Sequence, residues 1–186
     1  MESIFAAISN LYRWMNSPET VAAFFNNRFY TILAVVLLMR GKYAAYGSLW
    51  LTALVNIPGT ILHELLHYVV GVIMNAHPCN FSIFPKKDLL GGGYVMGSVG
   101  FRNITFYNAI PASLAPLLLL PLSFLINRYV LPYIPQTLSS YVIYILLQTI
   151  LIENAIPSRA DFKIAFMFLS GIILYGTLLV SLLLML

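Results

Sequence analysis

The chain reads ALVNIPGTILHELLHYVVGVIM from Ala53 to Met74, and this apolar stretch contains His63, Glu64 and His67. Residues four apart lie on one face of a helix, so both imidazoles can point at one metal ion. Glu64 can then reach a water bound to that metal and act as a general base. A carboxylate at bilayer depth costs about 2.5–3.5 kcal/mol on insertion scales, so Glu64 requires a partner there. The stretch therefore predicts a membrane helix that carries a metal site.

Zinc is the ion that this motif predicts. It accepts neutral imidazole, has no redox chemistry, and in catalytic sites takes three protein ligands and a water whose pKa falls to about 7. The alternative is a helix that faces a bundle, with two buried, hydrogen-bonded histidines and a glutamate that has no chemical role. Only three histidines occur in the 186 residues, which makes this spacing rare by chance.

The composition indicates a membrane protein. Hydrophobic residues make up 60% of the chain and charged residues 9%, with a mean hydropathy of +0.87. The length allows about five spans of ~20 residues and short loops, but no sizeable soluble domain. The ten Lys and Arg are scattered, so the net charge of +4 does not indicate a nucleic-acid surface. Cys79 is the only cysteine, which excludes an internal disulfide.

We therefore predict an all-α multi-pass membrane protein with about five transmembrane helices. Residues 1–28 are predicted to form interfacial helices, because an amphipathic segment precedes Asn16-Ser17-Pro18-Glu19. This segment lacks a basic region followed by a clean apolar core, so no cleavable signal peptide is predicted. Residues 29–186 are predicted to form the transmembrane domain, whose core is about 45–163. Its five spans are expected at 29–39, 45–74, 107–126, 137–152 and 162–186.

The segment 77–106 has a different pattern. Gly91 to Gly100 carries β-type residues between glycines, which predicts a small glycine-rich hairpin or a re-entrant segment. Non-helical backbone at membrane depth is tolerated only where protein or a water-filled cavity satisfies its polar groups. A loop outside the membrane is the alternative, since glycine clusters commonly mark loops.

The positive charges predict the orientation. With a cytoplasmic N-terminus, seven of the ten basic residues fall inside, and Arg40, Lys42 and Arg128 fall outside. The same topology places the His63/His67 end of its span and the segment from Glu153 to Asp161 on the cytoplasmic side.

The third metal ligand is sought among the six acidic residues. Glu2, Glu19 and Asp88 lie in polar surroundings, which leaves Glu153 and Asp161 beside Glu64 near the apolar spans. Asp161 stands at a predicted helix start after a proline turn, and Glu153 stays open as an alternative, as in zinc proteases with a glutamate ligand.

These features resemble the site-2 protease family of intramembrane zinc metalloproteases. The resemblance covers about residues 56–161 and consists of the His63–His67 motif, the glycine-rich segment, and Asn154-Ala155-Ile156-Pro157 followed by Asp161. It implies that Asp161 completes the zinc site, that Glu64 is the base, and that Asn154 orients a ligand or the substrate. The chain has one residue fewer between Pro157 and Asp161 than the family pattern, and Phe162 in place of its glycine.

The resulting hypothesis is a zinc endopeptidase that cleaves a transmembrane segment of another membrane protein, with no nucleic-acid partner. The unwound substrate would bind by strand addition to Gly92, Gly93, Tyr94 and Val95. Two rivals are a non-proteolytic protein with a structural metal or a helix-binding surface, and a zinc hydrolase of a small or lipidic substrate. The sequence leaves the substrate and the oligomeric state open.

Overall fold

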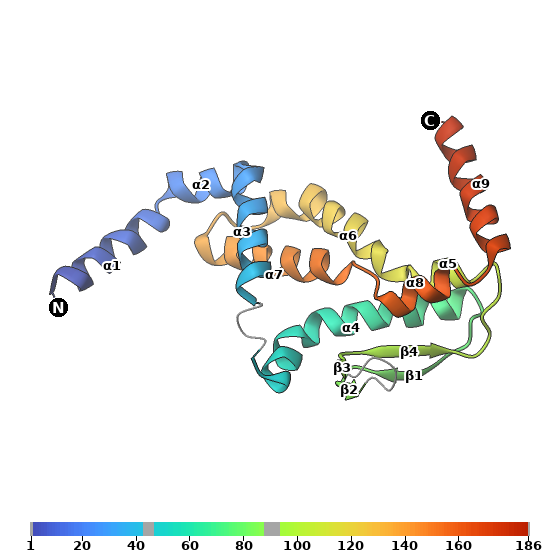
Figure 1. The fold of residues 1–186 in the computed structure, drawn as a ribbon. Helices are drawn as coiled ribbons and strands as arrows, with labels where there is room; N and C mark the ends of the chain where they lie inside the picture. Colours follow the sequence, from blue (N-terminus) through green and yellow to red (C-terminus); the bar gives the residue numbers. More distant parts are fainter. Residues whose placement is uncertain (1, 43–46, 88–93, 186) are drawn as a thin grey trace.

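The computed structural model describes residues 2–42, 47–87 and 94–185, and it is mostly helical (Figure 1). Gly91, Gly92, Gly93 and Asp88, which the sequence analysis named, lie outside the described residues. The helices are α1 (Glu2–Met15), α2 (Pro18–Asn26), α3 (Arg28–Lys42), α4 (Leu49–Ile73), α5 (Ala109–Ser113), η2 (Ala115–Leu118), α6 (Leu119–Leu125), η3 (Ile126–Val130), η4 (Leu131–Tyr133), α7 (Leu138–Asn154), α8 (Arg159–Ala165) and α9 (Leu169–Met185).

The two N-terminal helices that the sequence predicts are present. Ser17 caps α2 by accepting a hydrogen bond from the Thr20 backbone N–H, and Pro18 occupies the first helical position, as the Asn-Ser-Pro-Glu pattern predicted. Helix α1 extends away from the other helices (Figure 1), and its large apolar side chains are exposed: Ile4, Phe5, Ile8, Leu11, Tyr12 and Trp14. Their position in a membrane interface stays a prediction.

Candidate membrane spans number fewer than the five predicted. Among the described residues, one helical stretch, 115–133, is long and apolar enough to cross a membrane. Two bent pairs pass the same criteria together: α2 with α3, bent by 83°, and α7 with α8, bent by 51°. The described residues therefore contain one clear candidate span, or up to three if each bent pair is one span, which is compatible with a helical membrane protein.

The individual boundaries also differ from the prediction. Residues 107–126 do not form one helix, because α5 ends before Leu114 and a 3-10 turn begins at Ala115, with Pro116 in its first turn. Residues 162–186 are divided between α8 and α9. Helix α4 is 25 residues long but its histidines, glutamate and other polar residues lower its hydropathy, and α9 has only 17 residues.

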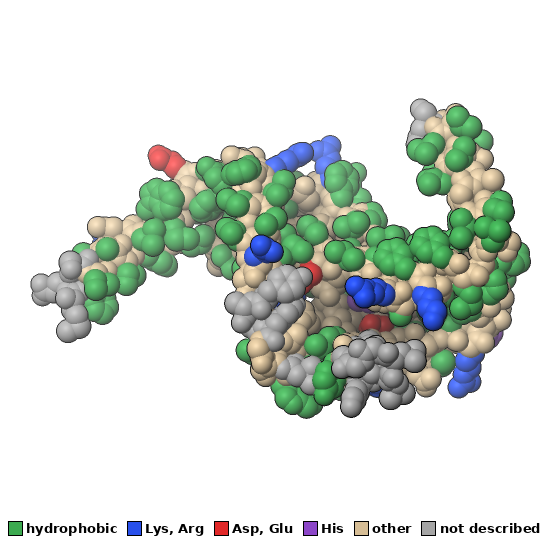
Figure 2. All heavy atoms as spheres, viewed as in Figure 1, with side chains coloured by type: hydrophobic (Ala, Val, Ile, Leu, Met, Phe, Trp, Pro, Cys, Tyr) green, Lys and Arg blue, Asp and Glu red, His purple; other side chains and the backbone are tan. Residues whose placement is uncertain are grey.

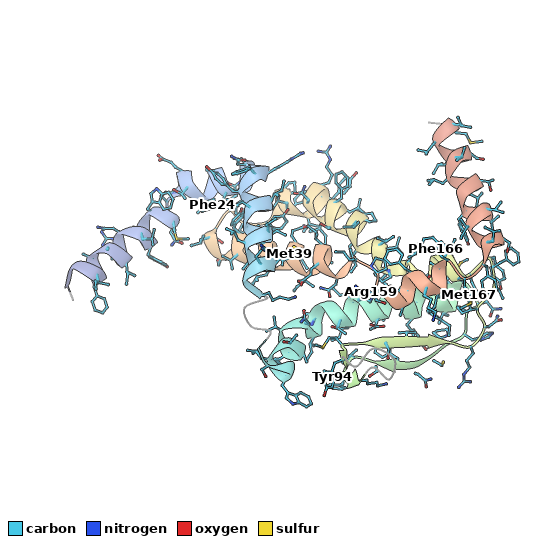
Figure 3. All side chains as sticks on the ribbon, viewed as in Figure 1. Phe24, Met39, Tyr94, Arg159, Phe166 and Met167 are labelled. Carbon is cyan, nitrogen blue, oxygen red and sulfur yellow. The ribbon has the colours of Figure 1, made fainter. Side chains whose placement is uncertain are left out.

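Helices α3 and α7 share one apolar core. Val35 of α3 is buried with Tyr141, Tyr144 and Ile145 of α7, and Met39 packs against this cluster (Figure 3). A second cluster joins Leu119 and Leu151 with residues of α4. This packing sets the end of α7 beside the middle of α4, which positions the functional residues described below.

One contact corrects the predicted sidedness. Lys42 Nζ lies 2.5 Å from Glu153 Oε2, and both side chains are 14% exposed. The charge distribution had assigned Lys42 to the outside and Glu153 to the cytoplasmic side, and two residues in direct contact cannot lie on opposite sides of a bilayer about 30 Å thick. Counting charges along the chain failed here because α3 and α7 pack together. The end of α3 that carries Lys42 and the end of α7 that carries Glu153 must therefore lie on the same side of the membrane.

The segment 78–101 forms two small antiparallel sheets. Strand β1 (Pro78–Ser82) pairs with β4 (Ser98–Phe101), and β2 (Lys86–Lys87) pairs with β3 (Tyr94–Val95). The β1–β4 sheet lies along α4 (Figure 1), and a Cβ at Gly71 of α4 would lie 2.6 Å from the ring of Phe101. The predicted extended structure is therefore present, and it covers one side of the helix that carries the histidine motif.

Candidate metal centre

Helix α4 places His63 and His67 on one face, as their spacing predicts. The two Nε2 atoms are 3.2 Å apart. His67 is 3% exposed, whereas His63 is partly buried. Two imidazole nitrogens this close together can both bind the same metal ion.

Asp161 meets the two histidines from helix α8. Its Oδ1 lies 3.4 Å from His67 Nε2 and its Oδ2 lies 3.7 Å from His63 Nε2. One ligand atom from each of the three residues lies within 4.8 Å of the others, so the group can hold a metal ion. Residues almost a hundred positions apart therefore converge on one point.

The start of α8 holds the Asp161 carboxylate in place. Ser158 caps the helix by accepting a hydrogen bond from the Asp161 backbone N–H, and Asp161 Oδ2 accepts one from the Ser158 backbone N–H at 2.6 Å. This reciprocal arrangement is a capping box. It satisfies Oδ2 and leaves Oδ1 directed toward the histidines, as expected for a metal-binding carboxylate that is itself hydrogen-bonded.

Backbone carbonyls determine which histidine nitrogen faces the group. His63 Nδ1 lies 2.8 Å from the Asn154 carbonyl oxygen, and His67 Nδ1 lies 2.8 Å from the Ala112 carbonyl oxygen. A carbonyl can only accept, so each Nδ1 carries the hydrogen and each neutral ring presents the Nε2 lone pair. Two lone pairs and a carboxylate then face one another, and such a set of acceptors requires a cation or added protons.

Glu64 lies beside the group without belonging to it. Its side chain is 7% exposed and lies under Gly97, in the turn between β3 and β4. A Cβ at Gly97 would be 2.6 Å from Thr60 Cγ2 and 2.7 Å from Glu64 Oε1. The close approach of this backbone confines the Glu64 side chain between α4 and the β segment.

The structure separates the two candidates for the third ligand. The Glu153 carboxylate is paired with Lys42 and is absent from the described group of residues that can hold a metal. Asn154 contributes its main-chain carbonyl to His63, while its side-chain Nδ2 donates to the Ile150 carbonyl at 2.8 Å. The Asn154 side chain also lies so close to Gly59 that any Cβ there would overlap it. Its position suits orientation of a ligand.

The residues predicted to bind substrate are only partly described. Tyr94 is 55% exposed at the edge of the β segment (Figure 3), and Val95 pairs with Lys86. Sequence reasoning missed Ala112, Gly59 and Lys42, because a contact between distant segments has no local sequence signal. Ser158 could have been found, since Ser-x-x-Asp after a proline is a capping-box signature.

Under the zinc-protease hypothesis of the sequence analysis, replacing Gly97 with alanine is expected to lower turnover about 100-fold while the metal content stays at the wild-type level. The new Cβ must displace Glu64 or Thr60, and an error of about 1 Å in a reacting group costs that much. Metal analysis and an activity assay on the same preparation measure both effects. Gly176→Ala is the control, since no described atom lies within 4 Å of a Cβ there. Equal activity of the two variants would contradict this prediction.

No protein-family model matches the chain, and no match was found among curated proteins or solved structures.

Proposed function

We propose that this protein is an intramembrane zinc metalloprotease of the site-2 protease type, which cleaves a transmembrane segment of another membrane protein. The observation that carries the proposal is the convergence of His63, His67 and Asp161, with both Nδ1 atoms bound to carbonyl oxygens. Glu64 lies one residue from His63 and outside the ligand group, as a general base must.

The donor set favours zinc over calcium and magnesium. Two neutral imidazoles and one carboxylate are the ligands of several catalytic zinc sites, whereas calcium and magnesium prefer oxygen donors alone. A structural zinc has four protein ligands, and the group among the described residues has three. The remaining coordination position is therefore proposed to hold a water molecule.

The residues divide the chemical work as follows. Zinc held by His63, His67 and Asp161 would supply a Lewis acid that polarises the scissile carbonyl and acidifies a bound water. Glu64 takes the proton of that water and later delivers it to the leaving amine. Asn154 and Ala112 keep the two imidazoles oriented through their carbonyls, and Ser158 keeps Asp161 oriented.

The proposed substrate is a membrane protein whose helix unwinds locally. Peptide bonds inside a helix are shielded, so the scissile segment must become extended before it reaches the metal. The β segment beside α4 offers strand edges to which such a segment can add. We assign Tyr94 and Val95, with the neighbouring Gly92 and Gly93, to this step.

Strand addition predicts the effect of a proline at position 95. Val95→Pro is expected to reduce cleavage at least tenfold, because proline removes a main-chain donor, while membrane insertion and zinc content stay near wild type. Val95→Ala is the matched control, since it shortens the side chain and keeps the N–H. If both variants cleave equally well, strand addition at this position has to be abandoned even if the zinc chemistry stands.

We place the metal site toward the cytoplasmic side, in a multi-pass protein with a cytoplasmic N-terminus. The support is the positive charge near the site: α8 carries Arg159 and Lys163, and Figure 2 shows basic side chains over this helix. Reporter fusions at Met1 and after Leu186 test the orientation. Because Lys42 contacts Glu153, the side of Lys42 must be assigned together with that of the site.

The proposed function is tested with the purified chain in proteoliposomes that contain a candidate membrane substrate. Removing the metal with a chelator is expected to abolish cleavage, and adding zinc back is expected to restore it. Mass spectrometry of the products shows which bond was broken. Cleaved lipid with an intact polypeptide would establish a lipid hydrolase instead, and full activity without metal would refute zinc catalysis.

A further inference from the structure

A second feature of the molecule is a cavity of about 450 Å³ between α3, α6 and α7. Side chains of these three helices form most of its walls, and Phe25 of α2, Asn127 of η3 and Leu131 of η4 complete them. None of the three residues of the metal group lines it. The cavity is therefore separate from the site described above.

The inner wall of the cavity suits a hydrocarbon chain. Val35, Val36 and Met39 line it from α3. Four of its polar side chains are engaged with one another: Ser123 is hydrogen-bonded to Gln148, and the Tyr144 hydroxyl donates to Asn127 Oδ1 at 2.9 Å. A polar ligand would compete with these buried bonds, whereas a methylene chain would leave them intact.

The size of the cavity decides between a lipid chain and a helix. A membrane-spanning helix is about 30 Å long and at least 10 Å wide, so its volume exceeds about 2,000 Å³. The cavity is several times smaller than this and lies within the range of about 300–1,000 Å³ that is typical of small-ligand sites. A substrate helix therefore does not fit, and a single acyl chain has the appropriate scale.

The outer wall opens onto an apolar surface. Ile32, Val36 and Phe124 line the cavity and are 62%, 48% and 65% exposed. They belong to helices that are among the candidate membrane spans, and apolar side chains cover this part of the surface in Figure 2. An acyl chain can enter from the surrounding bilayer without crossing water.

Arg28 provides a charge for the headgroup. It lines the cavity at the start of α3, and no aspartate or glutamate is among the described lining residues. Arginine binds phosphate oxygens in a bidentate manner, and a basic side chain near the membrane surface attracts anionic lipids. The positive end and the apolar interior together match an anionic amphiphile.

We propose that this cavity binds one acyl chain of an anionic phospholipid, whose phosphate contacts Arg28. The site does not depend on the proposed protease activity, and it is tested by binding alone. The purified 186-residue chain is incubated with vesicles of equal parts phosphatidylglycerol and phosphatidylcholine. Native mass spectrometry then measures how much of each lipid stays bound per chain.

The expected result is retention of about one lipid per chain with a preference for phosphatidylglycerol. Arg28→Gln is expected to lower this preference about fivefold, the value typical of one basic side chain at an anionic surface. Arg128→Gln is the matched control, since Arg128 is also exposed, lies next to Asn127 in the sequence and does not line the cavity. Equal losses in both variants would overturn the assignment of the headgroup to Arg28.

Filling the cavity tests the position of the acyl chain. Val36→Trp is expected to abolish retention of the lipid, whereas Leu33→Trp, on the same helix but outside the lining, is expected to preserve it. Size-exclusion chromatography establishes that both variants are folded. Lipid retention by Val36→Trp would refute the site. A wild-type dimer that holds no lipid would also refute it, because a second copy of the chain would then cover this surface.

Discussion

Glu64→Gln is expected to keep its metal and to lose turnover by about 10²–10⁴-fold, the contribution typical of a general acid–base residue. Glutamine has nearly the shape of glutamate, so the tight space under Gly97 stays filled and α4 keeps its packing. It cannot take a proton from water, however. The change therefore removes the proposed chemical role and little else.

The measurement combines metal analysis with cleavage of a membrane substrate in the same proteoliposomes. Glu19→Gln, in the first turn of α2, is the control for loss of a carboxylate away from the site. Activity of Glu64→Gln near the wild-type level would refute the protease proposal. Loss of both metal and activity would mean that Glu64 holds the metal, and its assignment as a base would be wrong.

The second large effect concerns the three proposed ligands. His63→Ala, His67→Ala and Asp161→Ala are each expected to weaken zinc binding more than 100-fold, because loss of a residue that only orients a ligand already costs 10–100-fold. Glu153→Gln is expected to change zinc affinity less than about threefold. Its carboxylate is engaged with Lys42 and is not part of the group.

Competition with a chromophoric zinc chelator measures these affinities. Asp161→Ala also removes the carboxylate of the capping box, so a loss of zinc could follow from unwinding of α8. Asp161→Asn separates the two effects, because its amide oxygen can still accept the hydrogen bond from Ser158. If Glu153→Gln lost zinc and Asp161→Ala kept it, the ligand assignment would be reversed.

The spacing of His63 and His67 could be interpreted from the sequence because the geometry of a helix is local. Both residues belong to one helix, and four positions correspond to about one turn. Their side chains therefore lie on the same face of the helix regardless of the surrounding structure, and their Nε2 atoms can approach each other. The cap at Ser17 and the extended backbone near Tyr94 depend on neighbouring residues in the same way. These are the parts that the sequence predicted best.

The spans were predicted less well for a physical reason. Hydropathy measures the composition of a window and does not show where a helix breaks. The α7–α8 pair bends by 51° after Asn154, and this bend allows Asp161 to turn back toward α4. The predicted continuous span at 162–186 is instead divided between α8, which ends at Ala165, and α9, which begins at Leu169. The predicted sidedness of Lys42 failed because the packing of α3 on α7 was not considered.

The sequence by itself determined the apolar character of the chain, the helix with its pair of histidines, and the short set of acids that could complete the group. Only the tertiary structure decided which acid does so, because Asp161 and Glu153 have the same chemistry and differ in what the fold brings near them. It also decided which histidine nitrogens face the group, since the carbonyls of Asn154 and Ala112 come from distant segments. A contact between distant segments depends on the packing of whole helices, and no local pattern of residues specifies it.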